Sequence, residues 1–355
     1  MGTENRKMEH VRICLEKEVE STYSGLEDVT LIHNALPHLD FQDIDTSLAF
    51  FNKKLSAPLL IASMTGGHKS TVEINKNLAV AVEELGIGMG VGSQRAAIEN
   101  EDLAESFTVV RDNAPHALIY ANVGFPQIME HGIEFVEKAV EMVDADAVAI
   151  HLNFLQEIIQ PEGEVNARGS ARALEQVCKE IKKPVIVKET GAGITKEVAL
   201  KLKEANVDAI DVGGKGGTSW SGVEIYRTKD DLAREVGRDF WNWGVPTAFC
   251  VPEVHQILPT IATGGLRSGL DVAKSLSLGA TAGSAALPFL KPATKSPDEV
   301  KNELEYFIRG LKIAMFLTGS EKIENLRDIP IFIHGLLKDW LESRDIDVRE
   351  FSRRR

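Results

Sequence analysis

The sequence predicts an α/β fold, a (β/α)8 barrel of the TIM type, with an N-terminal extension over residues 1–57 and C-terminal helices over residues 291–355 packed on the barrel. Three observations support this. The chain has 355 residues, 43% of them hydrophobic, enough for one large α/β barrel with additions. Short apolar runs alternate with helical patterns between residues 58 and 290, which predicts a parallel sheet. Nearly every apolar run ends in small or polar residues.

The apolar runs place eight strands at residues 58–62, 87–91, 118–123, 146–150, 184–187, 208–212, 260–263 and 280–285. Helical patterns follow at residues 72–85, 103–111, 133–143, 171–181, 196–205 and 270–278. The connection over residues 213–259 is too long for an ordinary barrel crossover and contains three of the four tryptophans. We expect a helical insertion packed on the barrel there, with a lid over the site as the alternative.

The strand ends favour a closed barrel over a doubly wound sheet. They carry the segments SMTGG (63–67), GSQR (92–95), NVG (122–124), HLN (151–153), KETG (188–191), GGKGGT (213–218) and TGGLRSG (263–269). Site residues of a barrel surround the C-terminal ends of its strands, whereas a doubly wound sheet gathers them at one crevice. The distribution of these segments along the chain therefore predicts a ring of site loops.

Composition excludes several functional classes. A formal net charge of −13 argues against a general nucleic-acid or anionic-membrane binder, although a local positive pocket can still take an anion. No apolar run is long enough to span a bilayer, and the first ten residues lack the apolar core of a signal peptide. The three cysteines are far apart and form no CxxC pair. We therefore expect no disulfide framework, no zinc site and a cytoplasmic location.

Two loops at consecutive strand ends predict a phosphate site. The segment 263–269 is rich in glycine, and Ser268 is expected to cap the following helix. Gly283 and Ser284 repeat the small-residue pattern at the next strand. Loops after strands seven and eight of such barrels frequently bind phosphate through main-chain N–H groups, and Arg267 can add a bidentate charge. One such loop would be explained by a structural turn, but two favour phosphate binding.

Other polar residues follow buried strands. Lys188 ends an apolar strand, where it either faces an anion or pairs with Glu189. The segment HLNFLQE (151–157) brings an imidazole, two amides and a carboxylate together, so it predicts a site, with Glu157 able to hold magnesium beside a substrate phosphate. A core histidine and a helix-capping carboxylate are the alternatives. Arg6 and Lys7 are expected, from their local sequence alone, to lie in a solvated tail.

Taken together, these motifs resemble the type 2 isopentenyl-diphosphate isomerases, flavin-dependent barrel enzymes of isoprenoid biosynthesis. The resemblance spans nearly the whole chain through NRKMEH, SMTGG, MGVGSQR, ANVG, HLNFLQE, PVIVKETGAGI, GGKGGTSW, WGVPT, GGLRSGLD and ALP. Glycine-rich loops are shared by related flavin barrels, whereas HLN followed by QE, with NRK and SQR, is more specific.

The resemblance implies reduced FMN, Mg2+ and NADPH as reductant, with isopentenyl and dimethylallyl diphosphates as substrates and a homotetramer or homo-octamer as the assembly. It implies FMN contacts from Met64, Thr65, Gly66, Ser93, Asn122, Lys188, Thr218, Gly264, Gly265, Arg267, Ala286 and Leu287. It implies substrate contacts from Arg6, Lys7, Arg95, His151, Asn153 and Gln156, a metal contact from Glu157, and catalytic roles for Lys188, Gln156 and His151.

Two other functions remain open from the residues. The first is an FMN-dependent 2-hydroxy-acid oxidoreductase, which needs a catalytic histidine after a late strand; residues 213–220 contain none. The second is a non-catalytic barrel that binds a phosphate ligand, which would not need Lys188, Gln156 and Glu157 together at strand ends.

Overall fold

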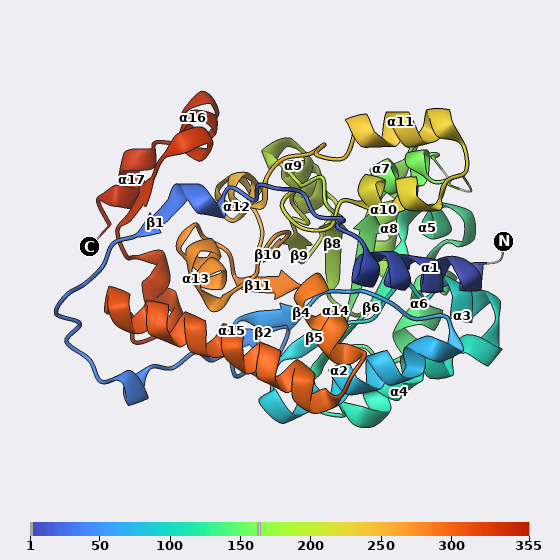
Figure 1. The fold of residues 1–355 in the computed structure, drawn as a ribbon, viewed down its shortest axis with the longest axis horizontal. Coiled ribbons are helices and arrows are strands. Elements are labelled where there is room, and N and C mark those ends of the chain that lie inside the picture. Colours follow the sequence, from blue (N-terminus) through green and yellow to red (C-terminus); the bar gives the residue numbers. More distant parts are fainter. Residues whose placement is uncertain (1–2, 162, 164, 355) are drawn as a thin grey trace.

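The computed structural model describes residues 3–161, 163 and 165–354 and contains a closed barrel of eight parallel strands (Figure 1). The strands are β4 (Leu59–Ile61), β5 (Gly88–Gly90), β6 (Leu118–Gly124), β7 (Ala147–Leu152), β8 (Val185–Glu189), β9 (Ala209–Asp211), β10 (Thr260–Thr263) and β11 (Ala282–Ala285). They pair in chain order, and β11 pairs with β4 in the register Ser284↔Leu60 to close the ring. The predicted barrel is confirmed, and the doubly wound sheet is excluded.

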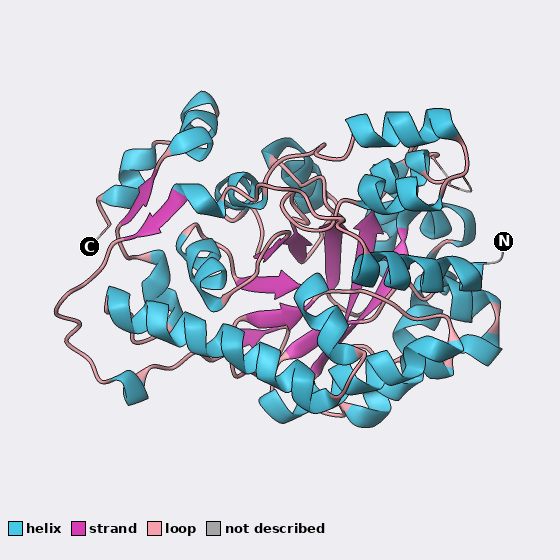
Figure 2. Cartoon of the chain, viewed as in Figure 1, coloured by secondary structure: helices cyan, strands magenta, loops and turns pink. Residues whose placement is uncertain are grey.

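Helices surround the strands (Figure 2). The helices that lie between β4 and β9 in the chain are α2 (Val72–Leu85), α3 (Arg95–Glu99), α4 (Glu105–Asn113), α5 (Phe125–His131), α6 (Ile133–Met142), α7 (Phe154–Ile159), α8 (Ser170–Glu180) and α9 (Lys196–Glu204). Later ones are α10 (Trp220–Arg227), α11 (Asp231–Asp239), α12 (Thr247–Val254), α13 (Gly269–Ser277) and α14 (Leu287–Ala293). Short 3-10 turns are η1 (Leu26–Asp28), η2 (Phe41–Asp43), η3 (Lys69–Thr71), η4 (Glu101–Leu103) and η5 (Ile323–Arg327).

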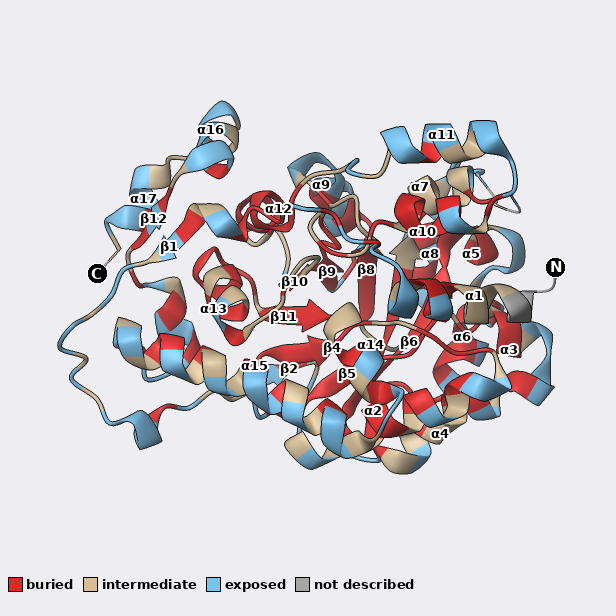
Figure 3. Ribbon diagram, in the orientation of Figure 1, coloured by how far each residue is buried: buried red, intermediate tan, exposed pale blue. Residues whose placement is uncertain are grey.

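The barrel strands are buried on both faces, while the surrounding helices expose their outer sides (Figure 3). Alternate strand residues pack outward against the helices, as Val185 and Val187 do, or inward, as Ile186 does. A hairpin of the N-terminal extension, formed by β2 (Leu48–Phe50) and β3 (Lys53–Leu55), packs into the interior at the N-terminal end of the barrel strands. This hairpin closes the end of the barrel opposite the strand C-termini.

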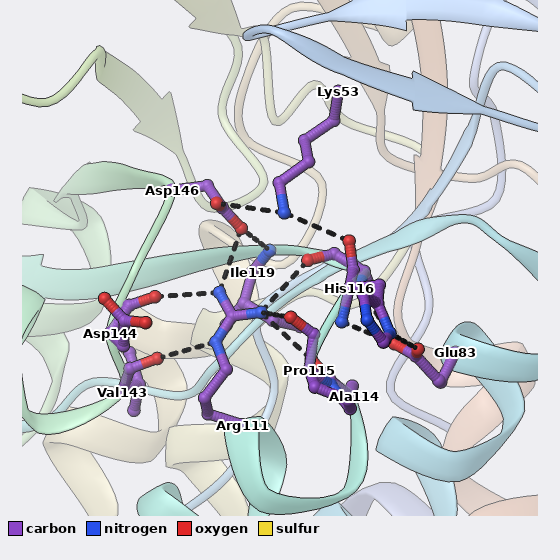
Figure 4. Close-up of polar contacts among 11 residues, drawn as sticks. Lys53, Glu83, Arg111, Ala114, Pro115, His116, Ile119, Val143, Asp144 and Asp146 are labelled. Carbon is purple, nitrogen blue, oxygen red and sulfur yellow. Dashed lines mark hydrogen bonds and ion pairs between the residues drawn. The ribbon is translucent and has the colours of Figure 1, made fainter.

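A polar network fastens the hairpin to the barrel (Figure 4). The Asp146 carboxylate accepts hydrogen bonds from Arg111 at 2.9 Å and from the Ile119 N–H at 3.0 Å, and it lies 3.3 Å from the Lys53 ammonium. Lys53 also donates to the His116 main-chain oxygen at 3.0 Å. Since these groups lie at the N-terminal ends of the strands, they stabilise the barrel away from any site at its other end.

The N-terminal extension and the C-terminal segment pair outside the barrel. Strand β1 (Val29–Leu31) pairs antiparallel with β12 (Ile331–Ile333), in the register Val29↔Ile333. The C-terminal segment otherwise consists of α15 (Pro297–Thr318), α16 (Gly335–Ser343) and α17 (Val348–Ser352). The predicted C-terminal helices are therefore present, but a strand lies among them that the sequence pattern did not indicate. In the described part of the chain, no helix combines the length and apolar character needed to cross a membrane.

The connection between β9 and β10 is the predicted helical insertion. It contains α10 and α11, which pack on each other, and α10 also packs against α7. The third helix, α12, packs against β10 and α9, as a barrel crossover helix does. The N-terminal helix α1 (Thr3–Glu16) packs against α10 and α14, so the extension and the insertion meet above the barrel (Figure 1).

Candidate active site

One large cavity opens at the C-terminal ends of the barrel strands. It is lined by α1 and by loops that follow the strands, and its empty volume, including the open mouth, is about 1530 Å³. Every residue to which the resemblance assigns a cofactor, substrate, metal or catalytic contact lines this cavity except Gly66, whose absent side chain leaves room for the Phe107 ring. Gly283 and Ser284 of the predicted phosphate loops do not line it.

Helix α1 forms one wall of the cavity. Arg6, Lys7 and His10 line it, so the expectation of a solvated tail is wrong. Desolvation in this wall lowers the pKa of Lys7 to about 8, with the charges of Arg6 and Arg95 acting in the same direction and Glu157 opposing them. Three cationic side chains therefore converge in one region, as an anion-binding site requires.

The segment HLNFLQE carries side chains from the end of β7 into α7. The Asn153 amide donates to Gln156 at 3.3 Å and to Glu157 at 2.9 Å, and Gln160 donates to the other Glu157 oxygen at 2.6 Å. All four side chains line the cavity. Glu157 lies in the first turn of α7, whose N-cap residue is Asn153.

His151 lies at the end of β7 and is neutral. Its Nδ1 lies 2.9 Å from Oδ1 of Asn122, whose own main-chain N–H donates to Gln94 at 2.9 Å. Because an amide oxygen only accepts, the Nδ1 proton is donated and Nε2 is left as an acceptor. Burial, together with the charges of Lys188 and Lys7, lowers the pKa of His151 to about 3. An anion bound at Nε2 would therefore bring a proton with it.

Glu224 of the insertion, which the sequence analysis missed, bonds two residues that line the cavity. Its Oε1 atom accepts from Gln156 at 3.0 Å and lies 2.9 Å from Nε2 of His10, and its Oε2 atom pairs with Arg227 at 2.5 Å. Hydrogen bonds from His10 and the neighbouring charges hold the pKa of Glu224 below its usual value, against the effect of burial. A single carboxylate thus joins α1, α7 and α10. A glutamate in an insertion helix gives no local signal for this role, because such residues usually face solvent.

Strand β8 contributes Lys188 and Glu189 to the cavity. The ion pair between them, given as the alternative to a functional lysine, is not formed: Lys188 donates to the main-chain oxygen of Glu189 at 3.0 Å. The Glu189 carboxylate instead accepts the N–H groups of Thr190, Gly191 and Ala192 at 2.5–2.7 Å. Burial raises the pKa of Glu189 to about 7, and the three N–H groups and Lys188 oppose this rise.

The glycine loops after β9 and β10 lie against each other. A Cβ atom on Gly264 would approach the main-chain oxygen of Gly214 to 2.0 Å, and one on Gly217 would approach the N atom of Gly265 to 2.9 Å. Gly264 and Gly265 have φ values of 115° and 86°, which only glycine adopts easily. The loops therefore expose main-chain groups at the cavity wall. The predicted helix cap at Ser268 is confirmed, because its hydroxyl accepts a hydrogen bond from the Asp271 N–H at 3.2 Å.

These loops fit the phosphate of a flavin nucleotide. Arg267, Ala286 and Leu287 line the same cavity, and the short helix α14 begins at Leu287; a short extra helix is frequent at barrel phosphate sites. The Thr65 hydroxyl is buried and has no hydrogen-bond partner in the described part of the chain, so a polar group is available to a bound ligand. Arg267 itself pairs with Glu20 of the segment that follows α1.

A magnesium ion fits here only with help from a ligand. Within residues 3–161, 163 and 165–354 no three His, Cys, Asp or Glu side chains are grouped to hold a metal. Two carboxylates of the described residues, Glu157 and Glu189, line the cavity, and the charge of Glu157 acts on Lys7. Mg2+ is commonly held by one or two carboxylates together with water and substrate phosphate, so the donor set suits an ion that arrives with a phosphate ligand.

Comparisons with known proteins agree with this geometry. Residues 136–331 match the FMN-dependent dehydrogenase family. The isopentenyl-diphosphate delta-isomerase of Archaeoglobus fulgidus is 63% identical over 344 residues, covering 97% of this chain and 100% of that protein. The enzyme of the same name from Methanosarcina mazei is 51% identical over 355 residues, covering 99% and 97%. A mandelate oxidase structure superimposes with a TM-score of 0.65 at 18% identity, covering 94% of this chain and 99% of that one, which supports the fold alone.

These identities extend over almost the full length of both proteins and include α1 and the insertion as well as the barrel. The chain therefore belongs to the isopentenyl-diphosphate delta-isomerase family, on the barrel of the FMN-dependent dehydrogenases.

Proposed function

We propose that this protein interconverts isopentenyl diphosphate and dimethylallyl diphosphate, moving a double bond without net oxidation. The observation that carries the proposal is that one cavity holds both the cationic cluster of Arg6, Lys7 and Arg95 and the flavin-type glycine loops. A diphosphate needs a cationic cluster, and the phosphate of FMN needs glycine loops that present main-chain N–H groups. The relatives that bear the isomerase name support the same assignment over the whole chain.

The reaction adds a proton at the terminal alkene carbon and removes one from the carbon nearer the diphosphate. Reduced FMN, when bound, supplies an electron-rich ring and a nitrogen that carries a proton. The chain's own residues bind and orient. Arg6, Lys7 and Arg95 hold the diphosphate, and α1 covers it and excludes water. Nε2 of His151 accepts a hydrogen bond from a protonated oxygen of the diphosphate.

Gln156 and Lys188 face the reacting groups in this proposal. The Gln156 amide is fixed by its hydrogen bond to Glu224, so it is oriented to hold the alkene end of the substrate. Lys188 has three donors and gives one of them to a carbonyl, so two remain for the cofactor and its charge favours an anionic reduced flavin. Glu157 holds Mg2+ against the diphosphate.

The proposal also includes a reductant, an assembly and a cellular location. NADPH is the reductant, because a flavin used in reduced form must be returned to it after oxidation. A homotetramer or homo-octamer is supported by exposed apolar side chains on the insertion, where Leu232 is 69% and Trp243 is 59% exposed. A cytoplasmic location is supported by three free cysteines.

The rival oxidoreductase function is tested directly. The cavity histidines in the described part of the chain are His10 and His151, and neither comes from residues 213–220, where the rival chemistry needs one. Lactate or mandelate added without oxygen to the FMN-loaded, oxidised protein should leave the flavin absorption unchanged. Bleaching of that absorption at a catalytic rate would contradict the proposal and favour the oxidoreductase.

A further inference from the structure

Lys188 and Asp211 are neighbours on the inner face of the barrel. They are register partners on β8 and β9. Side chains alternate along a strand, so Lys188 lies on the same face as Ile186, and Asp211 on the same face as Ala209. Ile186 and Ala209 both belong to the interior packing of the barrel. Both charged side chains therefore project inward, in the layer directly above that packing.

Both groups are buried where a lone charge is costly. Lys188 is 7% exposed and Asp211 is 2% exposed. Asp211 accepts the N–H of Gly213 at 3.1 Å, and Lys188 donates to one carbonyl at 3.0 Å. Removing an ion from water costs several kcal/mol unless an opposite charge or hydrogen bonds compensate it. Lys188 supplies a positive charge beside Asp211, and Asp211 supplies a negative charge beside Lys188.

The charges act on each other across the interior. Burial raises the pKa of Asp211, and the positive charge of Lys188 is the first of the effects that oppose this rise. The negative charge of Asp211 adds to burial in raising the pKa of Tyr120, on the inner face of β6. No hydrogen bond joins Lys188 and Asp211 in the described part of the chain. Asp211 therefore balances the lysine charge without occupying its donors.

Glu189 does not supply this balance. Its carboxylate is held by the three N–H groups of Thr190, Gly191 and Ala192, and Lys188 donates to its main-chain oxygen instead of its carboxylate. His151, the register partner of Lys188 on the other side, is neutral because burial lowers its pKa to about 3.

We propose that Asp211 is a positioning residue for the reaction: its buried carboxylate is the counter-charge that keeps the Lys188 ammonium at the cavity floor, with free donors facing the cofactor. The buried pair of Lys188 and Asp211 also sets how strongly the cavity floor favours anionic reduced flavin over oxidised flavin. The role of Asp211 in catalysis rests on the proposed function, whereas the charge pair of Lys188 and Asp211 does not depend on that function.

The first test uses protein without cofactor and compares Asp211→Asn, Lys188→Met and the double variant. Each single change leaves one charge buried without compensation, whereas the double change removes both. We expect each single variant to lower the unfolding temperature, and the double variant to lower it by clearly less than the sum. Simple additivity would contradict the pair. If Asp211→Asn does not fold, a folded double variant supports the pair, and failure of both contradicts it.

The second test measures the affinity of each folded variant for oxidised and for reduced FMN. Loss of the Asp211 charge makes the cavity floor more positive, so Asp211→Asn should raise the preference for reduced FMN roughly tenfold, and Lys188→Met should lower it. Asp208→Asn is the matched control, because that exposed carboxylate precedes the same strand at the other end of the barrel and bonds the Val185 N–H at 2.7 Å.

The two tests separate this inference from the proposed function. An unchanged FMN preference in Asp211→Asn, equal to that of the Asp208→Asn control, would overturn the role of Asp211. If instead the predicted shifts occur but wild-type protein lacks isomerase activity, the charge pair stands and the proposed function fails. With activity present, we expect Asp211→Asn to change kcat while leaving KM for isopentenyl diphosphate nearly unchanged.

Discussion

The Asn153 amide donates a hydrogen bond of 2.9 Å to the carboxylate of Glu157, and both side chains line the cavity beside Lys7. If Glu157 holds Mg2+, Glu157→Gln keeps its shape but loses the anionic oxygen that a hard cation prefers. We expect the Mg2+ requirement to rise by at least about tenfold, together with KM. FMN affinity should not change. Magnesium titrations of isomerase activity measure this.

Gln156→Ala is the matched comparison for that variant. Its amide is uncharged and is held by Glu224, so its removal should lower kcat with little effect on the Mg2+ requirement. A wild-type magnesium curve in Glu157→Gln would show that this carboxylate only organises the amides of Asn153 and Gln160.

Lys7 should make the isomerase activity fall at basic pH. Its pKa is lowered to about 8, chiefly by burial, so the free enzyme loses this positive charge as the pH rises through about 8. A diphosphate then binds less well, and kcat/KM should fall in that range. In Lys7→Arg the charge persists and the fall should move to higher pH. The exposed Lys17, just beyond α1, is the control, and an identical shift in Lys17→Arg would contradict the assignment.

Glu189 should make stability depend on pH. Its pKa is raised to about 7 by burial, above the value of an unfolded glutamate. Its favourable contribution is therefore complete below about pH 4.5 and is lost as the pH rises through about 7. Glu189→Gln keeps an oxygen for the three N–H groups but cannot ionise. We expect its unfolding temperature to exceed that of the wild type by a few degrees at pH 8 and to match it at pH 5. The same difference at both pH values would argue against titration of Glu189.

Gly264→Ala should abolish flavin binding. Its Cβ atom would approach the Gly214 oxygen to 2.0 Å, which pushes the two cofactor loops apart. Gly132→Ala is the matched control, because Gly132 also has a positive φ of 67° but has no atom within 4 Å of an added Cβ. Both variants pay the backbone strain of alanine, so a difference in FMN titrations isolates the loop contact. Equal FMN affinities would show that the loops do not form the cofactor site.

Asp146 stabilises the opposite end of the barrel. Asp146→Asn removes the charge that pairs with Arg111 and Lys53 (Figure 4) and should cost about 1–3 kcal/mol of unfolding free energy. FMN affinity should stay unchanged, because the site lies at the other end. Asp144→Asn is the control, since this exposed residue contributes its main-chain oxygen to the network. Denaturant unfolding measures both, and a loss of flavin affinity in Asp146→Asn would contradict the separation of the two ends.

The barrel could be predicted because each strand is a short local apolar run. Even β5 and β11, which consist largely of glycine, alanine and serine, follow the regular spacing of the repeat. Site residues at strand ends were predictable for the same reason, because the parallel strands bring their C-terminal ends together. Lys188, His151 and Glu157 are examples, and each lines the cavity.

Contacts between distant segments could not be predicted. Helix α1 has a polar sequence that indicates a solvated tail, but its position depends on Glu224 and Arg227, which bond His10 and Glu9 from the insertion. Strands β1 and β12 come from opposite ends of the chain, and three-residue strands give almost no pattern of their own. The partner of Lys188 is set by register with β9, which no local sequence feature reveals.

The most direct test of the proposed function uses FMN-loaded protein, reduced without oxygen and supplied with Mg2+ and isopentenyl diphosphate. We expect dimethylallyl diphosphate to form over many turnovers while the flavin stays reduced and no reductant is consumed in proportion to product. Protein with oxidised FMN should be inactive in the same assay. Failure of the reduced protein to form dimethylallyl diphosphate, or formation that consumes one reductant per product, would contradict the account.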